Sequence, residues 1–498
     1  MAGALACGGG GADVGESCAT VADCASGLQC LDHICRPGCL ANIDCGDGRV
    51  CEDRTCRLVE TELGQPCQSE AQCGPGQTCR LDPDGFVTNL GTCQLDRPAG
   101  AVFGEACQAD DDCRFGACAL GRCTPLCEES TECLRGFQCT GVPRVSADAT
   151  GLLGGFRGCL PNHATLSFEV PLTAKAVQSL WVPVASSAVS MVLVAEAAQP
   201  DEPIGITRVA DSGDRELFAT APPFDNYYTA RLRHRPLPGI AVLQIPSTSS
   251  VQLDTGAYKV DLSSFPGPRG GVTLAGRRLR VVEKLGTGAT LDIHFHFADL
   301  SEHPCLPIDR VLDATTAPTD PGFKGRYLAR LQQIFADATI AVGSVTYEST
   351  AAPVEMQGLT AATAPALFAT STSTTGVDVY LVRTLAPAGL EALVGGTPGA
   401  PLPGTRASGV AIAITGLCNN TDPAHRDDPA WERLARVTAH AIARHVGLFR
   451  NREPDSTAVD PIVDSPQSDD NLMYWGEDGG TNLSLEQRDI VRASPVLR

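Results

Sequence analysis

A repeated cysteine spacing restricts the fold of this chain more than any other feature of its sequence. Of the 23 cysteines, 20 lie between residues 18 and 159, in five copies of a unit close to C-x5-C-x5-C-x4-C. Modules this short bury almost no hydrophobic core, so we expect two disulfides to hold each one together. Four cysteines allow three pairings, and the spacing does not choose among them. The copies are Cys18, Cys24, Cys30, Cys35; Cys39, Cys45, Cys51, Cys56; Cys67, Cys73, Cys79, Cys93; Cys107, Cys113, Cys118, Cys123; and Cys127, Cys133, Cys139, Cys159.

Two further positions recur in register with the cysteines. An acidic residue precedes the second cysteine in four copies, and Gln72 stands there in the third. A glycine follows the second cysteine by three residues in every copy, which predicts a turn with positive φ. The array resembles the small cysteine-rich repeats of the Dickkopf N-terminal type, and that resemblance implies a spacer or binding role. The acidic residues are Asp23, Asp44, Asp112 and Glu132, and the glycines are Gly27, Gly48, Gly76, Gly116 and Gly136.

The density of cysteines also indicates a compartment. A reducing cytosol would keep so many thiols open, so we expect a secreted or cell-envelope protein in an oxidising environment. A zinc-cysteine array would show paired C-x-x-C knuckles, and the sequence has none. The 58 acidic residues outnumber the 38 basic ones without a long Lys/Arg run, which argues against nucleic acid as a partner. No uninterrupted apolar run is long enough to predict a membrane span.

The odd cysteine is Cys7, which follows the small and apolar residues MAGALA and precedes a run of glycines. This segment resembles the end of a bacterial lipoprotein signal peptide, which implies lipidation of Cys7 and a lipid anchor in the membrane. Residues 1–16 would then be a signal remnant and a glycine-rich tether. Because a basic region is missing and the apolar stretch is short, we expect the true translation start to lie upstream. The alternative is a disordered leader with an incidental thiol.

Residues 161–304 consist of short alternating runs separated by glycine- and proline-bearing turns, which predicts an antiparallel β-sandwich accessory domain. The last run, LDIHFHF, places Asp292, His294 and His296 on one face of a strand. A metal site that also uses Glu302 or His303 is one interpretation of this face. We expect instead that the polar face is simply solvated.

Residues 305–498 mix helical and strand patterns. Residues 325–340 and 427–447 have helical periodicity, whereas residues 376–385 and 408–415 read as strands. We expect Cys305 and Cys418, the two cysteines of this region, to bridge each other. The predicted fold class is therefore multidomain: disulfide-rich small modules (17–160), an antiparallel β-sandwich (161–304) and an α/β or α+β domain (305–498).

The second helix of this region carries HAIARHVGLFR, residues 440–450. This stretch resembles a degenerate form of H-E-x-x-H-x-x-G-x-x-H, the zinc-binding motif of the metzincin metallopeptidases, in a bacterial cysteine-rich secreted lipoprotein. In that family two histidines on one helix face and a third beyond the glycine bind zinc, and the glutamate is the general base. The resemblance implies that the first ligand position holds His440, the base position Ala441, the second ligand position Arg444, the third Arg450, and the methionine turn Met473.

Helical geometry extends this interpretation. His445 lies 140° from His440 around the helix at about 100° per residue, so it does not replace the missing ligand. Arg433, Arg436 and Arg444 lie within about 40° of His440, and such a face repels a divalent cation. We therefore expect neither zinc nor any other cofactor, and a core role for Met473.

The function predicted from these patterns is that of a catalytically inactive, metzincin-like protein that binds a protein or peptide ligand at the cell surface. In the family a strand above the metal helix pairs with extended substrate, and residues 409–415 (GVAIAIT) are the expected counterpart. An arginine-lined cleft suits acidic or carboxylate-bearing segments. The alternatives are a zinc-dependent metalloendopeptidase with a non-standard site, and a structural spacer of the envelope.

Overall fold

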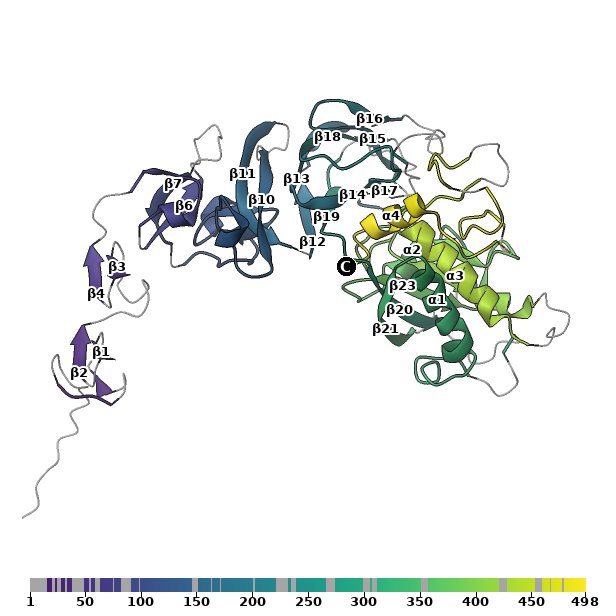
Figure 1. Cartoon of the computed structure of the whole chain (residues 1–498). Coiled ribbons are helices and arrows are strands. Elements are labelled where there is room, and N and C mark those ends of the chain that lie inside the picture. The colour runs from purple at the N-terminus through teal and green to yellow at the C-terminus, as the bar shows by residue number, and fades with distance from the viewer. Residues whose placement is uncertain are drawn as a thin grey trace, which may run out of the picture. The chain divides into compact units, whose positions relative to one another are not determined.

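A computed structural model of the chain, shown in Figure 1, divides into two compact units. One unit holds Met1–Val142 and Gly154–Leu160, and the other holds Pro143–Leu153 and Pro161–Arg498. The protein is multidomain and β-rich, with disulfide-bonded modules in the first unit. The structure describes residues 16–19, 23–24, 28–31, 34–37, 49–52, 55–58, 63–74, 76–81, 91–97, 99–145, 151–162, 164–170, 172–199, 202–220, 232–233, 239–265, 274–298, 305–306, 311–350, 357–420, 428–452, 459–465, 467–476 and 479–498.

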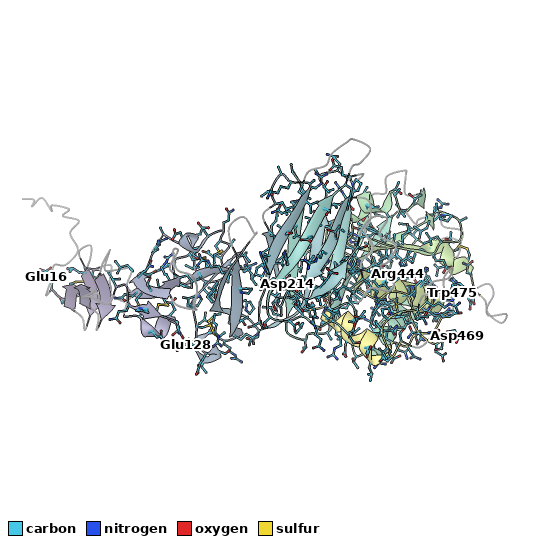
Figure 2. All side chains as sticks on the ribbon, turned by 90° about the horizontal axis from the view of Figure 1, so that it is seen from above. Glu16, Glu128, Asp214, Arg444, Asp469 and Trp475 are labelled. Atoms are coloured by element: carbon cyan, nitrogen blue, oxygen red, sulfur yellow. A yellow bond between two sulfur atoms is a disulfide. The ribbon has the colours of Figure 1, made fainter. Side chains whose placement is uncertain are left out.

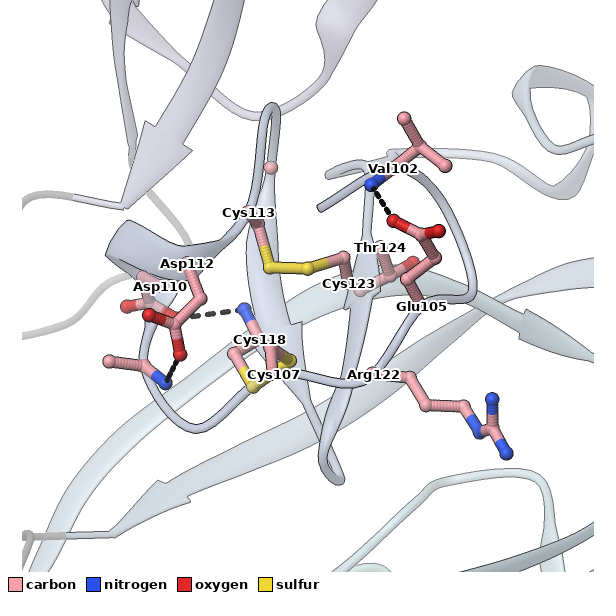
Figure 3. Close-up of a disulfide and its surroundings, with 12 residues drawn as sticks. Val102, Glu105, Cys107, Asp110, Asp112, Cys113, Cys118, Arg122, Cys123 and Thr124 are labelled. Atoms are coloured by element: carbon pink, nitrogen blue, oxygen red, sulfur yellow. Dashed lines mark hydrogen bonds between the residues drawn. A yellow bond between two sulfur atoms is a disulfide. The ribbon is translucent and has the colours of Figure 1, made fainter. Parts of the chain in front are cut away.

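In the three modules whose two disulfides the structure describes, the first cysteine is bonded to the third and the second to the fourth. In the fourth module Cys107 is bonded to Cys118 and Cys113 to Cys123 (Figure 3). The third and fifth modules repeat this connectivity, which the spacing alone leaves open. So many bridges fit an oxidising, extracellular compartment. The other module disulfides are Cys24–Cys35, Cys67–Cys79, Cys73–Cys93, Cys127–Cys139 and Cys133–Cys159.

Several predicted positions lie outside the described residues. They include the expected lipidation site, three repeat positions and the side chains of three cysteines. These are Cys7, Cys39, Cys45, Asp44, Gly27 and Gly48, and the side chains of Cys30, Cys51 and Cys56.

Short antiparallel strands complete each described module. Most modules contain one hairpin, and the third adds an extra strand at its edge. The strands are β1 (Leu28–Leu31), β2 (Ile34–Pro37), β3 (Arg49–Glu52), β4 (Thr55–Leu58), β5 (Pro66–Cys67), β6 (Gln77–Leu81), β7 (Gly91–Leu95), β8 (Ala117–Ala119), β9 (Arg122–Thr124), β10 (Phe137–Val145) and β11 (Leu152–Pro161).

The recurring acidic residue caps the loop between the first two cysteines of a module. Asp112 Oδ2 accepts a hydrogen bond of 2.7 Å from the backbone N–H of Gln108, and such backbone bonds lower the pKa of the Asp112 carboxyl. Asp23, Gln72 and Glu132 accept the corresponding N–H in their own modules. An amide oxygen accepts as a carboxylate oxygen does, which explains why glutamine replaces the acid in the third module.

The recurring glycine has the predicted positive φ. The angle is +73° at Gly76, +68° at Gly116 and +91° at Gly136. A Cβ on Gly116 would also collide with the backbone carbonyl of Thr124. Both the backbone conformation and the close approach therefore require glycine there.

Two four-stranded antiparallel sheets form the predicted β-sandwich. Their strand orders are β12-β19-β14-β17 and β13-β18-β15-β16, and apolar side chains such as Leu180, Met191 and Val281 are buried in one core between them. The alternating pattern does not predict β15 and β16, which are interrupted by register shifts. The strands are β12 (Ala164–Val170), β13 (Val177–Val184), β14 (Ala188–Glu196), β15 (Ile204–Ala210), β16 (Glu216–Ala219), β17 (Ile240–Ile245), β18 (Gly256–Ser264) and β19 (Arg278–Leu285).

A five-stranded mixed sheet follows, in the order β21-β20-β23-β26-β25. The first four strands in this order are parallel, and β25 is antiparallel to β26. The run LDIHFHF is the inner strand β20 of this sheet, so its assignment to the sandwich is corrected; alternation shows that a segment is a strand but not which sheet it joins. The bounds are β20 (Thr290–Ala298), β21 (Ala341–Thr350), β23 (Val377–Val382), β25 (Ala392–Val394) and β26 (Val410–Ala413), with a small pair formed by β22 (Gln357–Leu359) and β24 (Thr384–Leu385).

Helices cover both faces of the mixed sheet. On one face, the π-helical turn η6 (Phe323–Leu328), α1 (Ala329–Asp337) and α3 (Trp431–His445) share a core with the inward side chains of β20, β23 and β26. On the other face lies α2 (Ala364–Phe368). The helix η8 (Ile414–Cys418) follows β26, and α4 (Leu485–Ala493) begins with a Ser484–Gln487 capping box. The predicted Cys305–Cys418 disulfide is confirmed.

The sandwich and the mixed-sheet region pack together within the second unit. Arg233 and Asp460 form a fully buried ion pair of 2.9 Å, and the Arg233 guanidinium also stacks over the Phe449 ring at 4.3 Å. Lys284 Nζ donates to the backbone carbonyls of Arg492 and Ser494 at the end of α4. These polar contacts fix the C-terminal segment on the sandwich. Among the helices that the structure describes, none is long and apolar enough to cross a bilayer.

A buried carboxyl in the sandwich gives a pH-dependent prediction. Glu283 is fully buried, and the loss of water raises its pKa from 4.5 to about 8, against one backbone hydrogen bond from Ala185. The folded state therefore holds this proton where the unfolded chain has released it, so stability falls as pH rises between the two pKa values. In the wild type we expect the free energy of unfolding to fall by on the order of 2–4 kcal/mol as pH rises across this range. In Glu283→Gln this fall should disappear, which denaturant unfolding at several pH values measures.

The control is Glu169→Gln on the neighbouring strand β12, which should leave the pH profile unchanged. Parallel profiles for the wild type and Glu283→Gln would contradict the assignment of a neutral buried carboxyl.

Candidate functional site

A small cavity lies between helix α3, the edge strand β25 and the turn that follows Met473. Its volume is about 60 Å³. Arg444 and Trp475, which line it, are labelled in Figure 2. The lining residues are Leu390, Glu391, Ala392, Val394, Arg436, Val437, His440, Ala441, Arg444, Arg450, Trp475 and Gly476. All four positions that the motif aligns with zinc ligands and base, residues 440, 441, 444 and 450, therefore line one cavity.

His440 is fixed in one tautomer by the chain beneath it. Its Nδ1 donates a hydrogen bond of 2.7 Å to the backbone carbonyl of Leu472, which leaves Nε2 as an acceptor. Burial, followed by the charges of Arg444, Arg436 and Arg450, lowers the pKa of His440 to about 3, against the hydrogen bond to Leu472. The imidazole is therefore neutral at physiological pH.

The arginines around His440 differ in part from the prediction. Arg433 turns away from the cavity and pairs with Glu391, at 2.5 Å from Nη1 to Oε1. Arg450, beyond the helix, takes its place beside Arg436 and Arg444. Helical angles place the Cα atoms of these arginines on one face, but the long side chain of Arg433 bends toward the carboxylate of Glu391. The face still carries three guanidiniums.

Arg436 and Arg444 also hold the walls of the cavity. Arg436 donates to the backbone carbonyls of Gly480, Gly476 and Leu472, at 3.2, 3.1 and 3.4 Å. Arg444 Nη2 donates to Thr397 Oγ1 at 3.3 Å. The positive groups are thus positioned by the loops on both sides of α3.

Glu391 connects the edge strand to α3. Its carboxylate is buried and accepts from Arg433 at 2.5 and 2.7 Å and from Asn419 Nδ2 at 2.7 Å. Among the described residues that line the cavity it is the single carboxylate, and it is already engaged. The position of a general base, residue 441, holds only a methyl group. Within the described lining, no carboxylate is therefore left over to act as a general base.

On the side of the sheet that lines the cavity, the edge strand is β25 and not the predicted segment 409–415. That segment forms β26, which is paired on one side with β23 and on the other with β25. Within the described part of the chain, β25 pairs with β26 alone. Both strands are apolar in sequence, so their composition does not tell which one lies at the edge; the strand order decides it.

Other predicted residues of the motif occupy structural positions. Gly447 has φ of +116° and ends α3, and Met473 is completely buried in the core shared by α3 and the mixed sheet. His445 does not line the cavity; it packs on Gly399, and burial lowers its pKa to about 4. Trp431 and Leu434 are buried on the core side of the helix.

The competing site on β20 differs from the prediction of a solvated face. Asp292 and His296 are buried, and His296 Nε2 lies 2.8 Å from Asp378 Oδ1 and stacks on Tyr380. His294 hydrogen-bonds through both ring nitrogens, to Thr346 and to a backbone carbonyl. Strands β21 and β23 pair with β20 at its two edges and bring their side chains beside these residues. The sequence of β20 alone does not reveal these neighbours. Glu302 and His303 lie outside the described residues.

Clusters of potential metal ligands in the described part of the chain consist of cysteines alone. Each groups three sulfurs from one module, and those sulfurs form disulfides. In comparisons with known proteins, no protein-family model and no curated protein matches this chain.

The ion pair between Glu391 and Arg433 gives a prediction for the site. Glu391→Ala would leave the Arg433 guanidinium without this carboxylate in a largely buried place, so we expect a loss of about 2 kcal/mol in the free energy of unfolding. The amides of β25 should also exchange faster with solvent. Both are measured by denaturant unfolding and hydrogen exchange.

The control is the double variant Glu391→Leu/Arg433→Met, in which neither charge remains. It should recover most of the lost stability. Equal losses in the single and double variants would show that the ion pair does not hold the edge strand.

Proposed function

We propose that the C-terminal region is a catalytically inactive, metzincin-like domain that binds an extended protein or peptide segment outside the cytoplasm. The observation that carries this proposal is the cavity that residues 440, 441, 444 and 450 share. One imidazole remains there, a methyl group replaces the general base, and guanidiniums replace two ligands. Guanidiniums have no lone pair for a metal and repel a divalent cation.

Local geometry supports the alignment on which the family assignment rests. His440 donates through Nδ1 to the carbonyl before Met473, which is the arrangement that would leave Nε2 available to a metal. The glycine of the motif bends the chain after α3, so that Arg450 returns to the same cavity. A helix packed on a mixed sheet with an antiparallel edge strand is consistent with the same family.

The binding part of the proposal rests on strand β25. In its ladder with β26, Glu391 O accepts from Ala413 N and Gly395 N donates to Gly409 O. Because bonding direction alternates along an antiparallel strand, the backbone groups of Ala392 and Val394 point away from β26. An extended segment can add to this edge by the same hydrogen bonds.

The remaining parts fit a surface protein. The disulfide-rich modules resemble extracellular repeats and would separate the binding domain from its attachment point. A lipid on Cys7 would provide that attachment. The modules by themselves would act as a spacer, and the ligand would be bound by the C-terminal domain.

Metal analysis tests the loss of catalysis. We expect the purified, oxidised protein to contain no stoichiometric zinc and to cleave no peptide. The triple variant Ala441→Glu/Arg444→His/Arg450→His should gain one zinc, because it completes three nitrogen ligands and a base. Metal content is measured by mass spectrometry after dialysis.

Adding His440→Ala to the triple variant should abolish the gain, whereas adding His445→Ala should not. Stoichiometric zinc and chelator-sensitive peptide cleavage by the wild type would overturn the proposal.

The edge strand is tested with arrayed peptides. Val394→Pro removes one outward N–H without breaking the ladder to β26, so we expect at least about tenfold weaker binding of the peptides that the wild type retains. Val394→Ala, which keeps the N–H, is the control and should bind nearly normally. Equal binding by both variants would place the ligand elsewhere.

A further inference from the structure

A pocket with a volume of about 270 Å³ lies between the third and fourth disulfide-bonded modules. Glu70 begins the short helix η3 (Glu70–Gln72) of the third module, and Gln77 begins strand β6. Thr78 Oγ1 accepts a hydrogen bond of 3.3 Å from the backbone N–H of Gly116, which holds the two modules together at this point. The side chains that line this pocket, here called the module pocket, include those of Glu70, Gln77, Thr78, Asp96, Phe115 and Pro125.

Glu70 has a structural task that does not need its charge. Its Oε2 accepts a hydrogen bond of 3.1 Å from the backbone N–H of Cys79, the third cysteine of the module, and its Oε1 accepts one of 2.8 Å from Thr78 Oγ1. In the fifth module Ser130 Oγ accepts the corresponding backbone N–H, that of Cys139, at 3.1 Å. A neutral hydroxyl therefore caps the third cysteine as well as a carboxylate does. The negative charge of Glu70 is left for another role.

No basic side chain lies among the described residues that line the module pocket. Burial, with a smaller contribution from the charge of Asp96, raises the pKa of Glu70 from 4.5 to about 7, against its hydrogen bonds. The arginines of these modules are directed to other groups: Arg114 pairs with Asp96, at 2.9 Å from Nη2 to Oδ2, and Arg80 donates to the backbone carbonyl of Asp110. A cation that enters the pocket would therefore stabilise the ionised form of Glu70.

Gln77 supplies a second acceptor. Its Oε1 is buried and has no hydrogen-bond partner in the described part of the chain. Because each oxygen of Glu70 already accepts one hydrogen bond, the carboxylate does not offer the free pair of oxygens that the fork of a guanidinium prefers. The rotatable N–H donors of an ammonium suit one remaining lone pair of the carboxylate together with the amide oxygen. Phe115 and Pro125 offer apolar surface for the methylene groups beside it.

We propose that the module pocket binds a primary alkylammonium group, with the nitrogen between the Glu70 carboxylate and Gln77 Oε1 and the methylene groups against Phe115. A lysine side chain of a partner protein and a small free amine both carry this group. A calcium ion suits the pocket less, since it takes about six to eight oxygen ligands and Asp96 is engaged by Arg114. The site adds a binding role to the region that the proposed function treats as a spacer, and it uses none of the residues around α3.

Saturation-transfer NMR on the full, oxidised chain tests the proposal with three probes: Nα-acetyl-lysine amide, Nα-acetyl-arginine amide and 1,5-diaminopentane. We expect saturable binding of the lysine probe, at least about tenfold tighter than that of the arginine probe. Its affinity should fall roughly tenfold from pH 8 to pH 6, because protons compete with the ammonium for the Glu70 carboxylate. Tighter binding of diaminopentane than of the lysine probe would identify a free amine as the source of the same group.

Protein variants provide the second arm. Glu70→Ser introduces the residue that caps the fifth module, so the third module should keep its fold and disulfides. The lysine probe should bind this variant at least about tenfold more weakly and without the pH dependence. Gln77→Leu should also weaken binding, whereas Glu129→Gln removes an exposed carboxylate from the fifth module and should leave it unchanged.

Equal binding of the lysine probe by the wild type and Glu70→Ser would overturn the inference. Tighter binding of the arginine probe, or displacement of the lysine probe by an equal concentration of calcium, would overturn the assignment of an ammonium. Absence of saturable binding by every probe would overturn it as well. None of these results bears on peptide binding at β25.

Discussion

The close packing of helix α3 on the mixed sheet is the constraint on which the candidate site depends. Ala435, Ala439 and Ala443 are completely buried in the core that the helix shares with the sheet, together with the larger side chains of Leu434 and Ile442. The opposite helix face is thereby held under strand β25, and its side chains have a fixed place to converge. Gly447 then ends the helix and returns the chain, which brings Arg450 to the same cavity.

The residue types that line the cavity are the basis for proposing a domain without a metal. A divalent cation requires ligands with lone pairs, and two of the aligned positions hold guanidiniums. The tautomer of His440 is still the one that a metal-binding histidine needs, fixed by the carbonyl of Leu472. This hydrogen bond does not depend on a metal, since the carbonyl belongs to a turn beside the buried Met473.

Local patterns predict much of this structure. Helical periodicity predicts α1 and α3, and the recurring glycine correctly predicts positive φ at Gly116. The positions aligned with the zinc motif are found around one cavity, although only His440 keeps its residue type. These features depend on residues close in sequence, which periodicity and fixed offsets describe well.

The features that the sequence does not reveal all depend on pairing between distant segments. Disulfide connectivity, the neighbours of β20 and the identity of the edge strand follow from the topology of the sheets, which no single run of residues encodes. Glu391 shows the same limitation, since its partner Arg433 lies 42 residues away and turns from the face that helical angles assign to it. The buried pair of His296 and Asp378 is a second example, because alternation predicts the direction of His296 but not the strands that cover it.

The most direct test of the central claim is a crystal structure of the full chain grown with zinc and a peptide that the protein retains. The account predicts a peptide strand antiparallel to β25 and no anomalous zinc signal at His440. A zinc ion bound in the cavity, or a peptide bound at a different surface, would contradict it.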